Sequence, residues 1–101
     1  MSSYSYTTIN STCDMDQNGL QWYDYYFVDA TSGNITITLP TLYDSSYFQM
    51  HRIDTSSNTV TLVPQSGDTI NNTSSLLFPI NRYSQLIKTS SNWRCPRISF
   101  N

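Results

Sequence analysis

Charged residues are scarce in this chain, and glutamate is absent from it. Lys and Arg together number 5, Asp and Glu number 7, and the charged fraction is 12%, against a usual share of about 25%. A net charge of −2 offers no basic surface, so we expect no binding to nucleic acid. Weak charge repulsion also favours self-association.

Further absences narrow the class of protein. No apolar run is long enough to span a membrane, and residues 1–4 do not begin a signal peptide, so we expect neither membrane insertion nor Sec-type export. Cys13 and Cys95 are too few for a disulfide framework and lack metal-site spacing. They could pair because chain termini often meet, but two free thiols are the favoured interpretation. No cofactor is expected.

Residues that commonly carry catalysis are equally sparse. His51 is the one histidine, and no motif such as G-x-S-x-G supplies a nucleophile for it to activate. A pair of aspartates could still form a glycosidase site, although all of them except Asp24 are expected in loops or at strand ends. The sequence therefore predicts no enzymatic activity, with a polysaccharide-degrading enzyme as the remaining catalytic alternative.

Ser, Thr and Asn stand where Lys and Glu are usual, and this composition favours strands and turns over helices. One short phrase occurs three times: an apolar residue, then Thr-Ser-Gly/Ser-Asn, then a strand-like run. Each copy predicts a β-hairpin. The spacing from Thr31 to Thr55 is 24 residues and that from Thr55 to Thr89 is 34. Because a repeat array keeps a fixed period, the unequal spacings favour one reused turn within a single domain over a solenoid.

The chain length of 101 residues suits one domain. Residues 1–12 are expected to form a flexible lead-in or an edge strand, and residues 13–101 a single all-β domain. Eight or nine short strands with frequent turns and no helical periodicity predict a small antiparallel sandwich or jelly-roll-like fold. In the strand from residue 47 to 53, a β-bulge near His51 and Arg52 is expected to restore the alternation of apolar side chains.

Aromatic residues are the main functional clue, because Tyr and Trp concentrate at interfaces. The expected strand from residue 22 to 28 carries aromatic side chains on both faces, so its second face should meet another sheet or another subunit. Trp22 and Tyr26 on that face are the candidates for subunit contact. The exposed candidates for a ligand or receptor are Tyr4, Tyr6, Tyr43 and Tyr47.

Asp14, Asp16 and Asn18 match the first half of a calcium loop, D-x-D-x-N-G, in which side-chain oxygens converge on the ion. The bidentate Glu of that motif is absent, and Tyr25 stands in its place. The three residues are a weak metal candidate, and a plain acidic turn is the favoured interpretation.

Several segments together resemble a β-rich module of the tail-fibre, head-fibre and tailspike proteins of phages and other large DNA viruses. The segments are residues 25–40, residues 48–62, the Gly67–Asn71 turn, and the closing pair at residues 84–87 and 91–93. The chain departs from this module in its aromatic entry strand and in residues 94–97, and it lacks a long stalk, heptads and collagen-like repeats.

The resemblance implies a virion surface component, made in the host cytoplasm, that assembles as a homotrimer and contacts the host. We therefore expect a non-enzymatic, fibre-knob-like protein that binds a host glycan or protein receptor through exposed polar and aromatic loops. The alternative is a structural protein that decorates a capsid or assists fibre assembly and has no host ligand.

Overall fold

The computed structural model describes residues 5–96, and this range is all β, with no helix. It contains no helix long and apolar enough to cross a membrane. Two sheets, here called A and B, hold the strands. Sheet A contains β1 (Tyr6–Ile9), β3 (Tyr25–Val28), β5 (Tyr47–Arg52), β7 (Thr69–Ile70), β9 (Tyr83–Thr89) and β10 (Asn92–Arg94), and sheet B contains β2 (Cys13–Asp14), β4 (Ile35–Thr38), β6 (Val60–Val63) and β8 (Leu76–Leu77).

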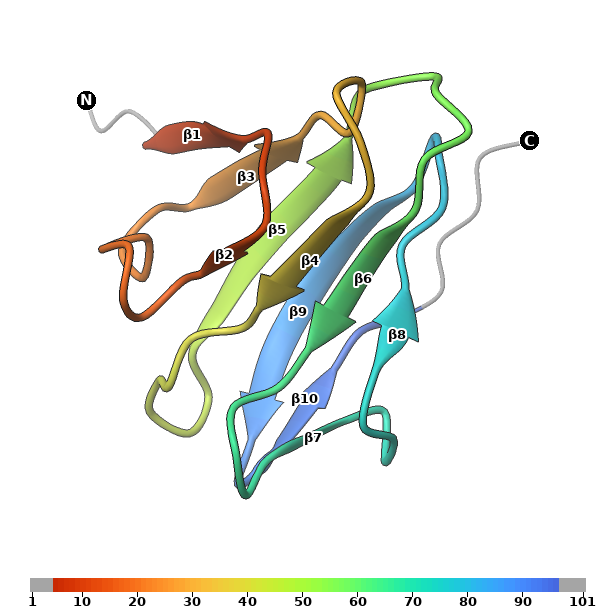
Figure 1. Ribbon diagram of the computed structural model, residues 1–101. Helices are drawn as coiled ribbons and strands as arrows, with labels where there is room; N and C mark the ends of the chain where they lie inside the picture. Colours follow the sequence, from red (N-terminus) through yellow and green to blue (C-terminus); the bar gives the residue numbers. More distant parts are fainter. Residues whose placement is uncertain (1–4, 97–101) are drawn as a thin grey trace.

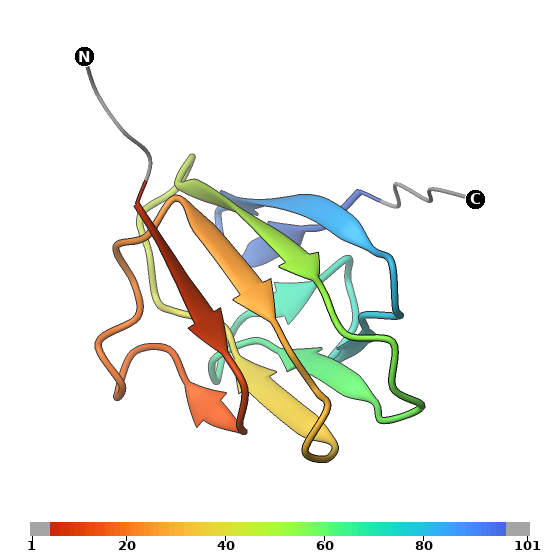
Figure 2. The same cartoon turned by 90° about the horizontal axis from the view of Figure 1, so that it is seen from above.

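The two sheets form two layers, and the chain passes from one layer to the other at almost every connection (Figure 1, Figure 2). The spatial order is β1-β3-β5-β9-β10-β7 in sheet A and β2-β4-β6-β8 in sheet B. Pairing is parallel within β1-β3-β5 and within β2-β4-β6. It becomes antiparallel where β9 joins β5, where β10 joins β9 and where β8 joins β6.

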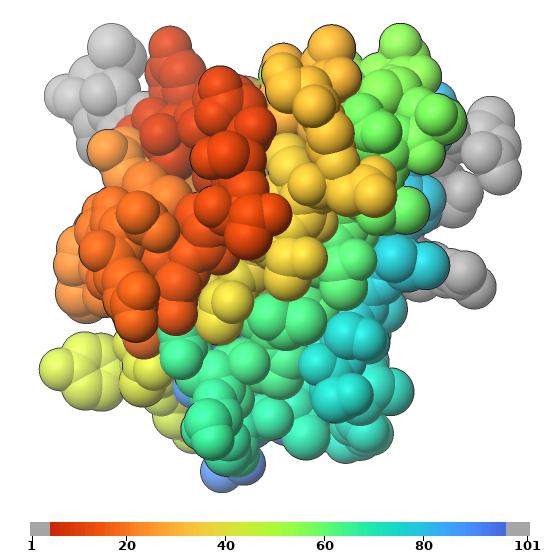
Figure 3. All heavy atoms as spheres, viewed as in Figure 1, coloured from red at the N-terminus to blue at the C-terminus, as the bar shows by residue number. Residues whose placement is uncertain are grey.

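This arrangement resembles a short β-solenoid. Three successive coils, β1-β2, β3-β4 and β5-β6, each place one strand in each sheet, and each coil lies beside the one before it. In the space-filling view the coils follow one another as bands of colour from red through yellow to green (Figure 3). The all-β prediction is confirmed, but the prediction of antiparallel pairing is wrong for the strands of these three coils.

The repeated phrase explains the difference. Its first two copies, at residues 28–34 and 53–58, are corners that carry the chain from sheet A to sheet B, so they are not hairpins. The strands that follow them, β4 and β6, pair in parallel with Ile35 opposite Val60. Only the third copy forms the expected hairpin, because β9 and β10 pair antiparallel across Ser90–Ser91. The unequal spacing of the three copies of the phrase therefore did not exclude stacked coils, although it favoured a single reused turn over a solenoid.

Alternation along the strands creates the core between the layers. One parity of each long strand is buried and the other faces outward, as in β5, where the pattern of burial alternates without interruption. The predicted bulge near His51 is therefore wrong: Arg52 occupies the buried parity, and Ile53 is exposed. The largest fully buried side chains include Trp93, Tyr26, Phe48, Phe78, Met15, Ile37, Leu39, Met50 and Leu62.

The two cysteines are separate free thiols, as favoured from the sequence. Cys13 lies in β2, and Cys95 is buried just after β10. Burial, assisted by the nearby charge of Asp14, raises the pKa of the Cys13 thiol. Because the thiolate is the reactive form, Cys13 is poorly suited to nucleophilic chemistry.

Candidate functional site

The outer face of sheet A carries a continuous row of rings across four strands. Tyr6 of β1 lies 5.7 Å from Phe27 of β3, Phe27 lies 6.2 Å from His51 of β5, and His51 lies 6.1 Å from Tyr83 of β9, measured between ring centroids. We call these four residues the aromatic row. Phe27 and His51 are opposite one another in the register of the parallel pair, and His51 is opposite Tyr83. Strand pairing thus places these three rings side by side, whereas Tyr6, which is opposite Tyr25 in the register, reaches Phe27 diagonally.

A groove with a volume of about 430 Å³ lies next to the aromatic row. It is bounded by the segment that enters β3 and by the loop that enters β5, and we call it the entry groove. Trp22 and Tyr47 on its walls are 73% and 63% exposed. The described residues that line it are Gln21, Trp22, Tyr23, Asp24, Tyr25, Leu42, Ser45, Ser46, Tyr47 and Gln49.

Two polar side chains, Asp24 and Gln49, line the entry groove beside its aromatic residues. The Asp24 carboxylate accepts hydrogen bonds from the backbone N–H of Ser5 at 3.0 Å and from its hydroxyl at 3.3 Å, which fixes the side chain beside the groove. Gln49 lines the groove, and its Oε1 is buried with no hydrogen-bond partner among residues 5–96. A buried acceptor without a donor is uncommon in folded proteins, and a ligand hydroxyl could satisfy this amide after a rotation of the side chain.

Aromatic faces combined with fixed amide and carboxylate groups suit a ligand with apolar faces and hydroxyl edges. The row and the groove present stacking surfaces, and Asp24 and Gln49 are positioned to recognise hydroxyl groups. A sugar ring has this chemistry. The outward positions of β1, β3, β5 and β9 carry no Asp, Glu, Lys or Arg side chain, so a neutral ligand fits this part of the face better than a charged one.

The two predicted subunit-contact residues are not on a common strand face. Trp22 lies before β3 and is exposed, whereas Tyr26 is fully buried in the protein's own core. The hydroxyl of Tyr26 donates to the carbonyl of Leu20, and its ring lies 4.9 Å from that of Phe48. Burial raises the pKa of Tyr26 to about 12. The prediction that Tyr26 forms a subunit contact is therefore wrong, because its side chain has no free surface. The outward face of β3 carries Tyr25 and Phe27.

The tyrosines predicted to contact a ligand lie in different parts of the structure. Tyr6 begins the aromatic row, and Tyr47 lines the entry groove. Tyr43 is 81% exposed in the loop between β4 and β5, and it is not part of the groove lining. Tyr4 lies outside the described residues. Sequence reasoning thus found two residues of the surface but missed Phe27, His51 and Tyr83, whose grouping depends on the strand register.

The weak metal candidate is a hydrogen-bonded turn. The Asp14 carboxylate accepts from the backbone N–H of Asp16 at 2.9 Å and from the Gln65 amide at 3.0 Å. The side-chain Oδ1 of Asn18 accepts from the backbone N–H of Asp14, and the Asp16 carboxylate accepts from the backbone N–H of Thr41 at 3.0 Å. These oxygens stabilise the turn and fasten it to neighbouring segments. Within residues 5–96, no group of three or more His, Cys, Asp or Glu side chains could hold a metal ion.

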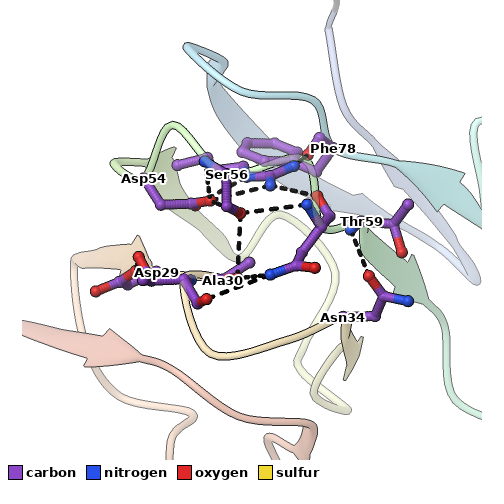
Figure 4. A network of polar contacts seen from close by, with 10 residues as sticks. Asp29, Ala30, Asn34, Asp54, Ser56, Thr59 and Phe78 are labelled. Atoms are coloured by element: carbon purple, nitrogen blue, oxygen red, sulfur yellow. Dashed lines mark hydrogen bonds and ion pairs between the residues drawn. The ribbon is translucent and has the colours of Figure 1, made fainter.

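A buried ion pair that the sequence did not reveal lies at the corner after β5. Nε of Arg52 lies 2.9 Å from Oδ1 of Asp54, and Nη2 of Arg52 lies 3.1 Å from Oδ2, so the pair is bidentate (Figure 4). Nη1 of Arg52 donates to the carbonyl of Phe78 at 3.1 Å. The Arg52 guanidinium holds the pKa of Asp54 well below its usual range, with further help from Ser56. Both side chains are almost completely enclosed.

The same network joins two successive corners. Nδ2 of Asn58 donates to the carbonyl of Ala30 at 2.6 Å, and the hydroxyl of Ser56 donates to that carbonyl at 3.2 Å (Figure 4). The N–H of Thr59 donates to Oδ1 of Asn34 at 2.9 Å. These contacts connect the first copy of the repeated phrase to the second, so the phrase fastens one coil to the next. Because its polar groups are committed to the fold, the network is a structural element.

Comparison of the chain with protein-family models, with curated proteins and with solved structures finds no match. The resemblance to viral fibre modules therefore remains a prediction.

Proposed function

We propose that this chain is a non-enzymatic binding domain of a virion surface fibre or knob, and that it attaches to a host glycan through the outer face of sheet A. The observation that carries the proposal is the aromatic row from Tyr6 to Tyr83, which continues toward the entry groove. Tyr6 is exposed and the other three rings are half-buried, and a contiguous row of accessible rings is typical of an interaction surface. The resemblance of the sequence to fibre modules supplies the viral context.

The state of the carboxylates supports binding over hydrolysis. Asp54 is paired with Arg52 and Asp68 with Lys88. The remaining aspartates accept hydrogen bonds from neighbouring groups of their own chain: Asp14, Asp16, Asp24, Asp29 and Asp44. A glycosidase needs two carboxyl groups facing one substrate, whereas each of these side chains is engaged by groups of its own chain.

Assembly as a homotrimer is a second part of the proposal. The low charge of the surface reduces repulsion between copies, and three copies would add avidity to weak contacts. The exposed side chain of Trp22 is the remaining candidate for subunit contact. If other copies cover the outer face of sheet A, the chain is the structural assembly protein of the alternative interpretation.

A glycan array incubated with the purified protein tests the attachment role, together with a host-cell binding assay. The proposal predicts specific, saturable binding to glycans that expose neutral sugar rings. A purely structural protein would bind neither the glycans of the array nor the host cells. An enzyme would shorten the glycans, which mass spectrometry of the array material would detect.

A further inference from the structure

A second hollow lies on the side of the molecule where the chain leaves β10. Its volume is about 920 Å³, more than twice that of the entry groove. It is lined by Asn71, Ser75, Leu76, Leu77, Pro79, Arg82, Arg94, Cys95 and Pro96. We call it the arginine cavity. It shares no lining residue with the entry groove.

Arg82 is a buried cation that has no acidic partner among residues 5–96. Its residue surface is 7% exposed, and its contacts among the described residues are all neutral: Nη2 donates to the carbonyl of Pro96 at 3.1 Å and to the sulfur of Cys95 at 3.8 Å, and the guanidinium lies 5.5 Å from the ring centroid of Phe78. Nε has no hydrogen-bond partner within residues 5–96. An uncompensated buried charge is costly, so an anion in the cavity would stabilise this arrangement.

The part of the cavity wall that residues 5–96 form contains a second cation and no carboxylate side chain. Arg94 also lines the cavity, and its side chain is exposed. The buried arginine Arg52, in contrast to Arg82, is paired with Asp54 in bidentate geometry. In a chain whose net charge is −2, two arginines without an acidic neighbour in the lining form a local positive site.

The size and the walls of the cavity indicate an organic anion. A volume of about 920 Å³ leaves room for an organic molecule beside the charged groups. Leu76, Leu77, Pro79 and Pro96 offer apolar surface. The Asn71 amide is fixed by hydrogen bonds with the backbone of Cys95, at 3.0 Å and 2.9 Å, which holds that wall in place.

We propose that the arginine cavity binds the carboxylate of an organic anion, with Arg82 and Arg94 supplying the positive charge and the leucine and proline side chains contacting the apolar part. Two sources share this chemistry: an acidic sugar and an aromatic acid. The site shares none of its described lining residues with the entry groove and does not depend on the function proposed for the aromatic row.

Titration of the isotope-labelled protein by nuclear magnetic resonance tests the site. The probes are glucuronate and benzoate, with glucose and benzyl alcohol as matched neutral controls and inorganic sulfate as a test of charge alone. The proposal predicts saturable shifts at the amides of residues 75–77 and 94–95 with one of the two carboxylates. The affinity should exceed that of its neutral control by about tenfold or more, as expected for a charge-assisted contact, and should exceed that of sulfate.

Two variants test whether Arg82 and Arg94 supply the positive charge that binds the carboxylate. Arg94→Gln changes an exposed side chain and should weaken carboxylate binding several-fold while leaving the spectrum of the free protein unchanged elsewhere. Arg82→Met keeps the volume of the buried side chain and should abolish binding; if this variant does not fold, Arg94→Gln still decides. Equal binding of a carboxylate and its neutral control, binding unaffected by Arg94→Gln, or no shift with either carboxylate would overturn the proposal.

Discussion

The rings of Phe27 and His51 lie 6.2 Å apart on the outer face of sheet A, although 24 residues of sequence separate the two positions. They meet because β3 and β5 pair in parallel and in register, one full coil apart. Tyr6 and Tyr83 extend the contact to the neighbouring strands on either side. A stack of coils thus converts scattered aromatic residues into a single surface.

Trp22 and Tyr26 should respond to substitution in opposite ways. Tyr26→Asp places a carboxyl group in the core and should unfold the domain, because the side chain is fully buried. Trp22→Ala removes an exposed side chain and leaves the core of the domain intact, so the variant should still fold and unfold in one cooperative transition. Thermal unfolding followed by circular dichroism separates the two outcomes.

Light scattering on the same Trp22→Ala protein tests the proposed trimer. If Trp22 forms the subunit contact, the variant should be a folded monomer while the wild-type protein is a trimer. A folded variant that keeps the mass of a trimer would contradict that role.

Asn58 should stabilise the stack of coils. Asn58→Ala removes the hydrogen bond to the carbonyl of Ala30. Because that carbonyl keeps the hydroxyl of Ser56 as a donor, the loss should be that of one hydrogen bond, about 0.5–1.5 kcal/mol of unfolding free energy. Asn10 is exposed and serves as a matched control; Asn10→Ala should change stability by less than about 0.5 kcal/mol. Urea unfolding measures both. Equal effects of the two substitutions would count against a role of the corner network.

The Arg52–Asp54 pair should be essential for folding at neutral pH. Asp54→Asn leaves the buried guanidinium without its counter-charge, which should cost about 3–5 kcal/mol, a large part of the stability of a small domain. Asp44→Asn is the matched control, because Asp44 is exposed and the amide keeps the acceptor oxygen for the N–H of Ser90. A similarly small loss of stability in both variants would show that the ion pair is dispensable.

Acid should destabilise the wild-type protein through the same pair. The pKa of Asp54 is lowered in the folded state, so its contribution is fully present above the usual carboxyl pKa of about 4. That contribution is lost as the pH falls from about 4 toward the lowered folded-state value. The free energy of unfolding should therefore fall more steeply below pH ~4 in the wild-type protein than in a folded Asp54→Asn variant. Parallel pH profiles would contradict this assignment.

Local patterns predicted much of the fold. Alternating apolar and Thr residues indicated β4 and β6, and the absence of helical periodicity indicated an all-β chain. Parallel pairing was not predictable in the same way, because the phrase at residues 28–34 and the phrase at residues 87–92 contain similar turn residues. One forms a corner between sheets and the other a hairpin, and the choice depends on long-range pairing.

The candidate site was only partly predictable for a related reason. Tyr6 and Tyr47 could be selected as tyrosines near the lead-in and a loop. Phe27 and His51 become neighbours through register alone. Arg52 occupies a position that the alternation reserves for an apolar residue, and the presence of Asp54 two residues later was the available signal for a buried ion pair.

Tyr47 and Tyr43 provide the most direct test of the proposed binding face, because both are exposed tyrosines and only Tyr47 lines the entry groove. The measurement is the apparent dissociation constant of each variant for the strongest glycan on an array, relative to the wild-type protein. The account predicts that Tyr47→Ala weakens binding by about tenfold, a typical cost of removing an aromatic contact, and that Tyr43→Ala leaves it unchanged. Glycan binding that is insensitive to Tyr47→Ala, or no glycan binding by the wild-type protein, would contradict it.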